Sequence, residues 1–258
     1  MRIALLTGAG MSAESGIPTF RDALTGLWAR FDPQRLATPE AFREDPALVW
    51  GWYRWRAARV RNARPHAGHH GVAALETLGH AVTVVTQNVD DLHERAGSSR
   101  VLHLHGRLLS SRCTSCGARM APDPIAHDLP EGVSEGARED PPACRACDGG
   151  RFRPDVVWFG EPLPEDAWRA AQEAIAACDL LLVVGTSGLV HPAAALPLHA
   201  LARGTPVLEI NPARTALSAQ ADAAWQVPAA AGIERLLARL ETSPEAGPRM
   251  LIGHCPRR

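Results

Sequence analysis

One stretch near the start of the chain decides the fold: Ile3-Ala4-Leu5-Leu6-Thr7-Gly8-Ala9-Gly10-Met11-Ser12-Ala13. Its apolar first half is typical of a strand that is buried on both faces of a parallel sheet. The glycines that follow allow a tight turn and let the backbone approach a pyrophosphate at the start of a helix. This GxGxxA pattern indicates dinucleotide binding, although only weakly when it is taken alone.

Further apolar runs predict more strands, and segments with apolar residues three and four apart predict helices between them. The alternation favours an α/β fold, a Rossmann-like doubly wound parallel sheet. The predicted strands are Ile3–Thr7, Val82–Thr86, Leu180–Val184 and Val207–Ile210, and the predicted helices are Ala67–Leu78 and Glu165–Ala177. Two short runs, Val101–Leu104 and Val156–Phe159, are compatible with either a strand or an extended loop.

A polar or glycine motif follows each predicted strand directly. These motifs are Gly8-Ala9-Gly10, Gln87-Asn88-Val89-Asp90, Gly185-Thr186-Ser187 and Asn211. Ligands of open α/β sheets bind at the carboxyl ends of the strands, so we expect one large site at this edge. An ordinary Rossmann dehydrogenase is excluded, because it needs a second strand ending in an acidic residue about twenty residues on, and Thr19–Arg35 has no strand pattern.

Composition argues against two classes of partner. The chain has 258 residues and a formal net charge of -1, so it has no overall basic field that would attract nucleic acid. No apolar run approaches the ~18 residues that a membrane span needs. The first strand-like segment starts at Arg2 and leaves no room for a signal peptide, so we expect a cytoplasmic protein.

Two stretches interrupt the alternation of strands and helices. Thr38-Pro39-Glu40 and Pro46 predict the starts of two helices within Leu36–Ala63, and Leu109–Pro154 is polar and rich in Pro and Gly. Neither stretch is suited to building a core like that of the sheet. We therefore predict a large domain of residues 1–35, 64–108 and 155–241, a small domain of residues 36–63 and 109–154, and a poorly ordered tail of residues 242–258.

Two cysteine pairs in the second stretch, Cys113-Thr-Ser-Cys116 and Cys144-Arg-Ala-Cys147, have the CxxC spacing of a tetrahedral zinc site. In a reducing cytoplasm such pairs favour metal binding over disulfides. Four thiolates close the coordination sphere, so we expect one structural Zn²⁺ with no open position for water. A zinc ribbon for nucleic acid is disfavoured, because Met120–Pro142 carries acids and prolines and no basic-aromatic stripe.

The longest motif, Gly-Ala-Gly-Met-Ser-Ala-Glu-Ser-Gly-Ile-Pro-Thr-Phe-Arg at residues 8–21, resembles the sirtuin signature. Other sirtuin-like motifs follow in the family's order: Thr86–Asp90, Leu104-His105-Gly106, the two CxxC pairs, Val156–Glu161 and Gly185-Thr186-Ser187. The resemblance extends to about residue 240 and implies an NAD-dependent protein-lysine deacylase. In that reaction the acyl oxygen attacks C1′ of the ribose, nicotinamide leaves, and the acyl group passes to ADP-ribose.

The reaction needs a base that takes a proton from a ribose hydroxyl. The resemblance implies that His105 is this base and that Asn88 is also catalytic, whereas we do not expect His103 to be the base. It places Phe20 over the reacting ribose, where the ring would exclude water. The NAD-binding residues that it implies are Gly8, Ala9, Gly10, Ser12, Ala13, Phe20, Arg21, Gln87, Asn88, Asp90, Gly185, Thr186, Ser187, Asn211 and Ala229.

Tyr53 and Arg56 lie three residues apart and would share one face of a helix, where a guanidinium and a phenol together can receive a carboxylate. With the small Ala37 before them, they resemble the class III sirtuins that remove succinyl and malonyl groups. From helix physics alone, a Trp-rich amphipathic helix in which Arg56 is merely solvated is the favoured interpretation, and only the resemblance reverses this balance. The run Val156-Val157-Trp158-Phe159-Gly160 resembles the sirtuin segment that pairs with the substrate backbone.

Other functions remain open at this stage. They are a general lysine deacetylase without acidic-acyl preference, an NAD-dependent ADP-ribosyltransferase, and a nonenzymatic module that binds NAD or zinc. The expected partners are acylated lysines of other proteins, because this chain contains no lysine of its own. We expect no specific nucleic acid, no membrane, and a monomer.

Overall fold

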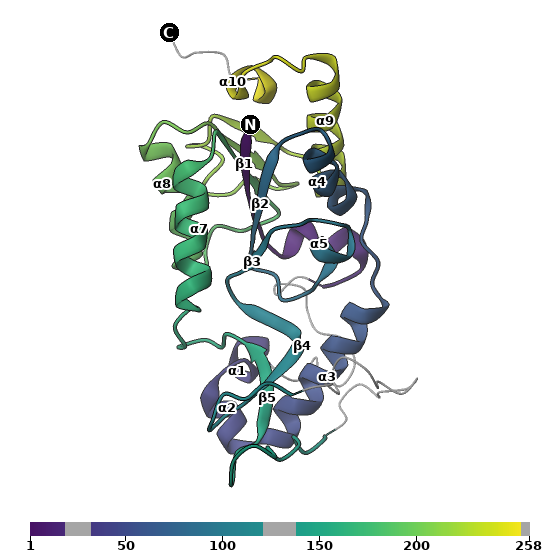
Figure 1. Ribbon diagram of the computed structural model, residues 1–258, viewed down its shortest axis with the longest axis vertical. Coiled ribbons are helices and arrows are strands. Elements are labelled where there is room, and N and C mark those ends of the chain that lie inside the picture. Colours follow the sequence, from purple (N-terminus) through teal and green to yellow (C-terminus); the bar gives the residue numbers. More distant parts are fainter. Residues whose placement is uncertain (19–31, 121–137, 254–258) are drawn as a thin grey trace.

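The computed structural model describes residues 1–18, 32–120 and 138–253 (Figure 1). The strands are β1 (Arg2–Thr7), β2 (Ala81–Thr86), β3 (Val101–His103), β4 (Gly106–Cys113), β5 (Phe152–Val156), β6 (Leu180–Val184), β7 (Val207–Ile210) and β8 (Ala223–Trp225). The α-helices are α1 (Pro33–Leu36), α2 (Pro39–Glu44), α3 (Pro46–Asn62), α4 (Ala67–Thr77), α5 (Leu92–Arg95), α7 (Glu165–Ala177), α8 (Leu196–Ala202), α9 (Ala229–Thr242) and α10 (Pro248–Ile252). Short 3-10 helices cover Ala9–Met11, Ala13–Ser15 and Ala193–Ala195.

The large sheet confirms the predicted α/β architecture. Its six strands run in the order β3-β2-β1-β6-β7-β8, and every neighbouring pair is parallel. This is the strand order of dinucleotide-binding sheets once the separate β4–β5 pair is left out. Since β1 lies between β2 and β6, the chain leaves β1 and β6 at a topological switch point, where such sheets bind their ligands.

Helices cover both faces of this sheet. Alternate residues of each strand point to opposite sides, so apolar side chains on both faces need to be buried. On β1, Ile3 and Leu5 pack with residues of α4, α9 and α10, whereas Ala4 and Leu6 pack with residues of α7 and α8. All four side chains are buried. The apolar run that begins the chain is therefore explained by burial on two faces.

The β4–β5 pair and the helices α1–α3 form the other end of the molecule (Figure 1). Their apolar side chains make a third buried cluster, which includes Trp50, Trp52 and Tyr53 of α3, Leu108 of β4 and Phe152 of β5. The prediction that these stretches build no core comparable to the sheet's is wrong. The stretch Leu36–Ala63 is itself rich in apolar residues, and its helix α3 supplies large aromatic rings that the antiparallel strands cover.

Local signals in the sequence mark several boundaries correctly. Thr38 precedes α2, and its hydroxyl oxygen accepts a hydrogen bond from the Ala41 N–H, while Pro46 is the first residue of α3. The predicted poor order of the tail is wrong for α10, because Leu251 and Ile252 are buried against the sheet core. No helix in the described ranges combines the length and the apolar character that crossing a bilayer requires.

Candidate functional site

The ends of four parallel strands lie at one edge of the sheet. Thr7, at the end of β1, pairs in register with Thr86 of β2 and with Val184 of β6, and Val184 pairs with Ile210 of β7. The motifs that begin at residues 8, 87, 185 and 211 therefore leave the sheet side by side. This is the arrangement that the sequence predicts for a single site.

Glycines let two of these loops touch. A Cβ atom on Gly8 would lie 2.9 Å from the carbonyl oxygen of Gly185, and one on Gly10 would lie 2.8 Å from the same oxygen. The Gly10 N–H donates to that oxygen at 2.8 Å. The two loops pack backbone against backbone, and this contact requires glycine at positions 8 and 10. Close approach of a pyrophosphate would be a second reason for glycine there.

A chain of hydrogen bonds joins the first loop to the second. The Asn88 side-chain amide donates to the Gly8 carbonyl at 3.1 Å and to the Ser12 hydroxyl at 3.0 Å, and that hydroxyl donates to Asp90 Oδ2 at 2.9 Å. Because the amide nitrogen is used in this way, Asn88 can offer its carbonyl oxygen to a ligand. Burial raises the pKa of Asp90, while hydrogen bonds from the Leu92 backbone and from Ser12 favour its ionised form.

His105 is held in one tautomer. Its Nδ1 lies 2.9 Å from the carbonyl oxygen of Gln87, and since a carbonyl only accepts, Nδ1 carries the proton. Nε2 then keeps its lone pair. Burial lowers the pKa of the His105 imidazole, so the ring is neutral near pH 7 and Nε2 can accept a proton.

The third and fourth loops are tied to the second through Thr186. The Gln87 side-chain amide donates to the Thr186 hydroxyl at 2.9 Å, and the Asn211 side-chain amide donates to the Thr186 carbonyl at 2.8 Å. Ser187 follows, half-buried, at the same edge. Three predicted NAD-binding residues, from the loops that follow β2, β6 and β7, are therefore in direct contact.

Ala229 and Ala13 belong to segments that also meet here. Ala229 is the buried first residue of α9, and the next backbone N–H, of Ala230, donates to Glu14 Oε2 at 3.0 Å. Among the hydrogen bonds between described residues, none uses the backbone N–H of Ala9 or of Ala13. These N–H groups suit an anionic oxygen, because both stand at the start of a short helical turn.

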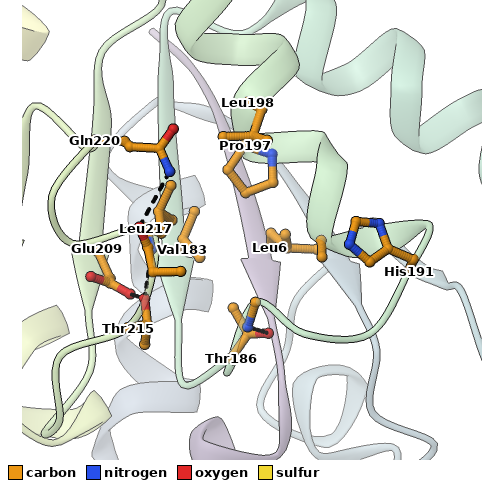
Figure 2. A pocket seen from close by; sticks show the side chains of 13 residues that line it. Leu6, Val183, Thr186, His191, Pro197, Leu198, Glu209, Thr215, Leu217 and Gln220 are labelled. Carbon is orange, nitrogen blue, oxygen red and sulfur yellow. Dashed lines mark hydrogen bonds between the residues drawn. The ribbon is translucent and has the colours of Figure 1, made fainter.

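A separate cavity of about 110 Å³ lies behind Thr186, between α8 and the loop after β7 (Figure 2). Leu6 and Val183 form its floor and belong to the core beneath α7 and α8. The buried Glu209 carboxylate accepts hydrogen bonds from the hydroxyls of Thr215 and Ser218, so its charge is compensated within the loop. Of the residues that the sequence assigns to the site, only Thr186 is among the cavity's lining residues.

The predicted substrate segment runs directly past His105. The Val157 N–H donates to the His105 carbonyl at 2.8 Å, and the Phe159 N–H donates to the Ala37 carbonyl at 2.9 Å. Val156 ends β5, and Gly160 has a φ of +86°, so the chain turns away just after Phe159. The segment therefore lies between the candidate base and Ala37, with the Phe159 ring 44% exposed.

Tyr53 reaches this segment from α3. The indole Nε1 of Trp158 donates to the Tyr53 hydroxyl at 2.9 Å, and both rings are buried. The guanidinium carbon of the half-buried Arg56 lies 5.5 Å from the centre of the Tyr53 ring. Burial lowers the pKa of Arg56, opposed by Tyr53 and by Asp90. The predicted carboxylate receptor thus lies beside the predicted substrate segment.

The four cysteines come together at the far end of the β4–β5 pair. Their Sγ atoms lie within 4.8 Å of one another, with 3.6 Å from Cys113 to Cys147 and 3.8 Å from Cys116 to Cys144. In each pair the first sulfur accepts a backbone N–H two residues later, at 3.3 Å. Four sulfurs on such turns fit one tetrahedral zinc ion, which would have no ligand position left for chemistry.

Several residues that support the site were given no role from the sequence. Thr7, Thr86 and His93 support Asn88 from beneath, and His103 bridges the Asn88 carbonyl and the Glu94 carboxylate, at 3.1 and 2.7 Å. Hydroxyl residues at the ends of buried strands were a usable signal, because each needs a partner there. Two predicted NAD-binding residues, Phe20 and Arg21, lie outside the described ranges.

The chain is similar to known proteins over most of its length. The sequence profile of the Sir2 family matches residues 8–192. An NAD-dependent protein deacylase of Mycobacterium tuberculosis (strain ATCC 25177 / H37Ra) is 52% identical over 241 residues, which are 93% of this chain and 98% of that protein. NAD-dependent protein deacylase 1 of Pseudomonas aeruginosa is 57% identical over 213 residues, 82% of this chain and 83% of that protein.

Solved structures agree with this similarity. The crystal structure of a Sir2 homolog–NAD complex matches with a TM-score of 0.83 and 45% identity, over 93% of this chain and 90% of that one. A Sir2 protein bound to an acetylated peptide matches with a TM-score of 0.77 and 29% identity, over 95% and 94% of the two chains. From the matched profile, the relatives and the shared fold, we conclude that this chain belongs to the Sir2 family.

Proposed function

We propose that this enzyme prefers lysine side chains that carry acidic acyl groups, succinyl and malonyl above all, and that it also has some deacetylase activity. Membership of the Sir2 family makes the chain an NAD-dependent protein-lysine deacylase. NAD supplies the ribose carbon that loses nicotinamide and receives the acyl oxygen. The remaining steps fall to the residues of the site.

His105 is the base in this proposal. With Nδ1 donating to the Gln87 carbonyl, Nε2 faces the reaction unprotonated and can take the proton of a ribose hydroxyl. The lowered pKa keeps the imidazole in its basic form at neutral pH. The backbone carbonyl of His105 also accepts a hydrogen bond from the Val157 N–H, so the base and the substrate segment keep a fixed spacing.

The residues around Asn88 would hold the cofactor. Asn88 offers its amide oxygen to the ribose or to the nicotinamide carboxamide, and its amide nitrogen is fixed by Gly8 and Ser12. The N–H groups of Ala9 and Ala13 are suited to the phosphates, and Gly185, Thr186, Ser187 and Asn211 to the adenosine side. Asp90, Gln87, Gly10 and Ala229 complete the described part of this pocket.

The observation that carries the acyl preference is the position of Tyr53: its hydroxyl accepts a hydrogen bond from Trp158 of the substrate segment, and the Arg56 guanidinium carbon lies 5.5 Å from the centre of its ring. A carboxylate at the end of an acyl chain would find a hydroxyl donor and a positive charge in a buried place. Ala37, whose carbonyl holds Phe159, is small enough to leave room for a chain longer than acetyl. An uncharged acetyl group would gain nothing from the guanidinium.

The peptide itself would pair through its backbone with residues 156–160, between the two domains that the sequence predicts. Such pairing reads little sequence, so we propose acylated lysines of many proteins as substrates. We also propose that the chain acts as a monomer in the cytoplasm. Sedimentation velocity over a hundredfold range of concentration tests the monomer, which a rise in sedimentation coefficient would contradict.

The test of the acyl preference is a comparison of kcat/KM on one peptide that carries acetyl-, malonyl- or succinyl-lysine, with products identified by mass spectrometry. We expect higher values for the acidic acyl groups and release of nicotinamide and O-acyl-ADP-ribose. Equal values would point to a general deacetylase. Transfer of label from NAD onto protein would point to ADP-ribosyl transfer.

A further inference from the structure

We infer that Trp158 determines acyl specificity by forcing the Tyr53 hydroxyl to act as a hydrogen-bond donor toward the acyl group. This inference rests on the proposed acidic-acyl function and deepens it. It concerns the hydrogen bond from Trp158 Nε1 to the Tyr53 hydroxyl, which measures 2.9 Å. Trp158 is a positioning residue in this argument, because it acts through Tyr53.

The argument begins with what each group can do. An indole N–H can only donate, so in this contact the phenol oxygen must accept. The phenol proton then has to point away from Trp158. Both side chains are almost fully buried, Trp158 at 3% and Tyr53 at 1% exposure. Bulk water therefore cannot take the place of either group in this hydrogen bond. Burial also raises the pKa of Tyr53 to about 12, and the hydroxyl keeps its proton at neutral pH.

Trp158 is itself fixed by groups on its other sides. Its backbone N–H donates to Glu161 Oε2 at 2.8 Å, and the Arg153 guanidinium carbon lies 3.3 Å from the centre of its ring. Arg153 is held by both carboxylate oxygens of Glu161 and by the Val156 carbonyl. The centre of the Phe42 ring lies 5.3 Å from the centre of the Trp158 ring. The indole N–H therefore has one direction, toward Tyr53.

A Tyr53 hydroxyl held as a donor distinguishes acyl groups by the chemical group at the end of the acyl chain. A succinyl or malonyl carboxylate accepts the Tyr53 proton and lies close to the Arg56 guanidinium, so both interactions favour it. A methyl group accepts nothing and leaves a buried donor without an acceptor. Arg56 also forms a side-chain hydrogen bond with Tyr53, in which its guanidinium can only donate. Without the Trp158 N–H, Arg56 alone would orient the Tyr53 hydroxyl, which would be held less firmly as a donor. Discrimination between acyl groups should then weaken.

The experiment measures the ratio of kcat/KM for succinyl- to that for acetyl-lysine peptide in the wild type, Trp158→Phe, Tyr53→Phe and the double variant. We expect each single variant to lower the ratio about three- to tenfold, and the double variant to lower it no further than Tyr53→Phe alone. An unchanged ratio in Trp158→Phe overturns the inference, and so do two losses that multiply in the double variant.

Trp50→Phe is the matched control, because Trp50 lies on α3 in the same buried cluster and its Nε1 has no hydrogen-bond partner among the described residues. We expect it to leave the ratio at the wild-type value. If Trp158→Phe does not fold, placing β-(3-benzothienyl)alanine at position 158 keeps the double ring and removes only the N–H. The same loss of ratio is expected there, and an unchanged ratio would again overturn the inference.

The two proposals fail in distinguishable ways. If the wild type has no preference for succinyl over acetyl, the proposed acidic-acyl function is wrong, and this inference falls with it. If the wild type has the preference and Arg56→Met removes it, but both changes at position 158 leave it intact, only the role of Trp158 is wrong. Arg56→Met therefore belongs in the same series of measurements.

Discussion

The Thr7 hydroxyl donates to the hydroxyl oxygen of Thr86 at 2.9 Å, and this bond joins the last residues of β1 and β2 beneath the candidate site. Thr86 Oγ1 also accepts the backbone N–H of Asn88 at 3.0 Å. His93 Nε2 lies 3.3 Å from the Thr7 hydroxyl. All of these side chains are buried, so the loop that carries Asn88 rests on a hydrogen-bonded layer inside the protein.

Thr86→Val keeps the shape of that layer but removes the acceptor of the Asn88 N–H. An unpaired buried donor costs about 1–3 kcal/mol, and we expect the loss to appear mainly as a KM for NAD that is raised about tenfold. Thr86→Ser should restore most of the affinity. Steady-state kinetics with varied NAD checks this, with Thr83→Val on the same strand as control. Equal effects of the two valine variants would contradict the prediction.

His105→Asn should lower kcat by at least a hundredfold, because no other described group is proposed to take the ribose proton. The pH profile gives a second check. Burial lowers the pKa of His105, so the basic form is lost only as pH falls below 6.5. We expect kcat/KM of the wild type to be level from pH 8 to about 6.5 and to decline on the acid side. A decline that begins above pH 7 would argue against this assignment.

Two other buried histidines should make the fold sensitive to acid. Burial lowers the pKa of His69 to about 2 and that of His93 to about 4. Both values lie below the unfolded value of about 6.5, so the stabilisation is complete above pH 6.5 and is lost as pH falls. Each histidine should remove about 1.4 kcal/mol of unfolding free energy per pH unit, His93 down to its folded pKa.

Urea unfolding at pH 7.0, 6.0 and 5.0 measures this slope, and His93→Gln should reduce it. A glutamine in this place keeps a donor for the Thr7 hydroxyl but does not titrate. Parallel curves for the variant and the wild type would show that another group is responsible.

Removal of zinc should affect acyl-peptide binding. Cys113 and Cys144 belong to the same buried cluster as Trp50, Trp52 and Tyr53. Loss of the metal removes the bonds that hold the four sulfurs together and lets the thiols take up protons, so we expect this cluster to loosen. Chelator titration should therefore change tryptophan fluorescence and weaken the binding of acyl peptide in step with zinc release. Unchanged tryptophan fluorescence after full release of zinc would show that the packing of this cluster does not depend on the metal.

Gly10→Ala should prevent formation of the site, because the new Cβ would lie 2.8 Å from the backbone of Gly185, which cannot move aside as a flexible side chain can. We expect that calorimetry detects no NAD binding and that the melting temperature is lower than in the wild type. Gly247→Ala is the control, since no atom in the described part of the chain lies within 4 Å of its Cβ position. Normal NAD binding by Gly10→Ala would show that the loops can separate.

The sequence predicts the large sheet well, because its strands are apolar runs such as Leu180–Val184 and each ends at a polar motif. It does not predict β4 and β5. Arg153 and Pro154 of β5 are not typical of a buried strand, and Arg153 is buried only because Glu161 and the Trp158 ring receive its charge. Such pairing depends on segments brought together by the fold, and no local pattern records it.

The candidate site follows the same division. Residues that follow strand ends, such as Asn88 and Thr186, were predicted to lie at one edge of the sheet, and the structure has them there. The contact of Ala37 with Phe159 joins segments more than a hundred residues apart, and only the structure places it beside His105. The bond between Trp158 and Tyr53 likewise depends on the packing of α3 against β5.

The position of β1 in the sheet has a consequence for how the protein is made. β1 needs β6 as its second neighbour, and β6 begins only at Leu180. At about 5–20 residues per second, the ribosome takes roughly 10 to 35 s to deliver that partner after β1 has emerged. Throughout this interval one edge of an apolar strand stays unpaired, and the nascent enzyme is exposed to misassociation. Its nucleotide pocket can close only late in translation.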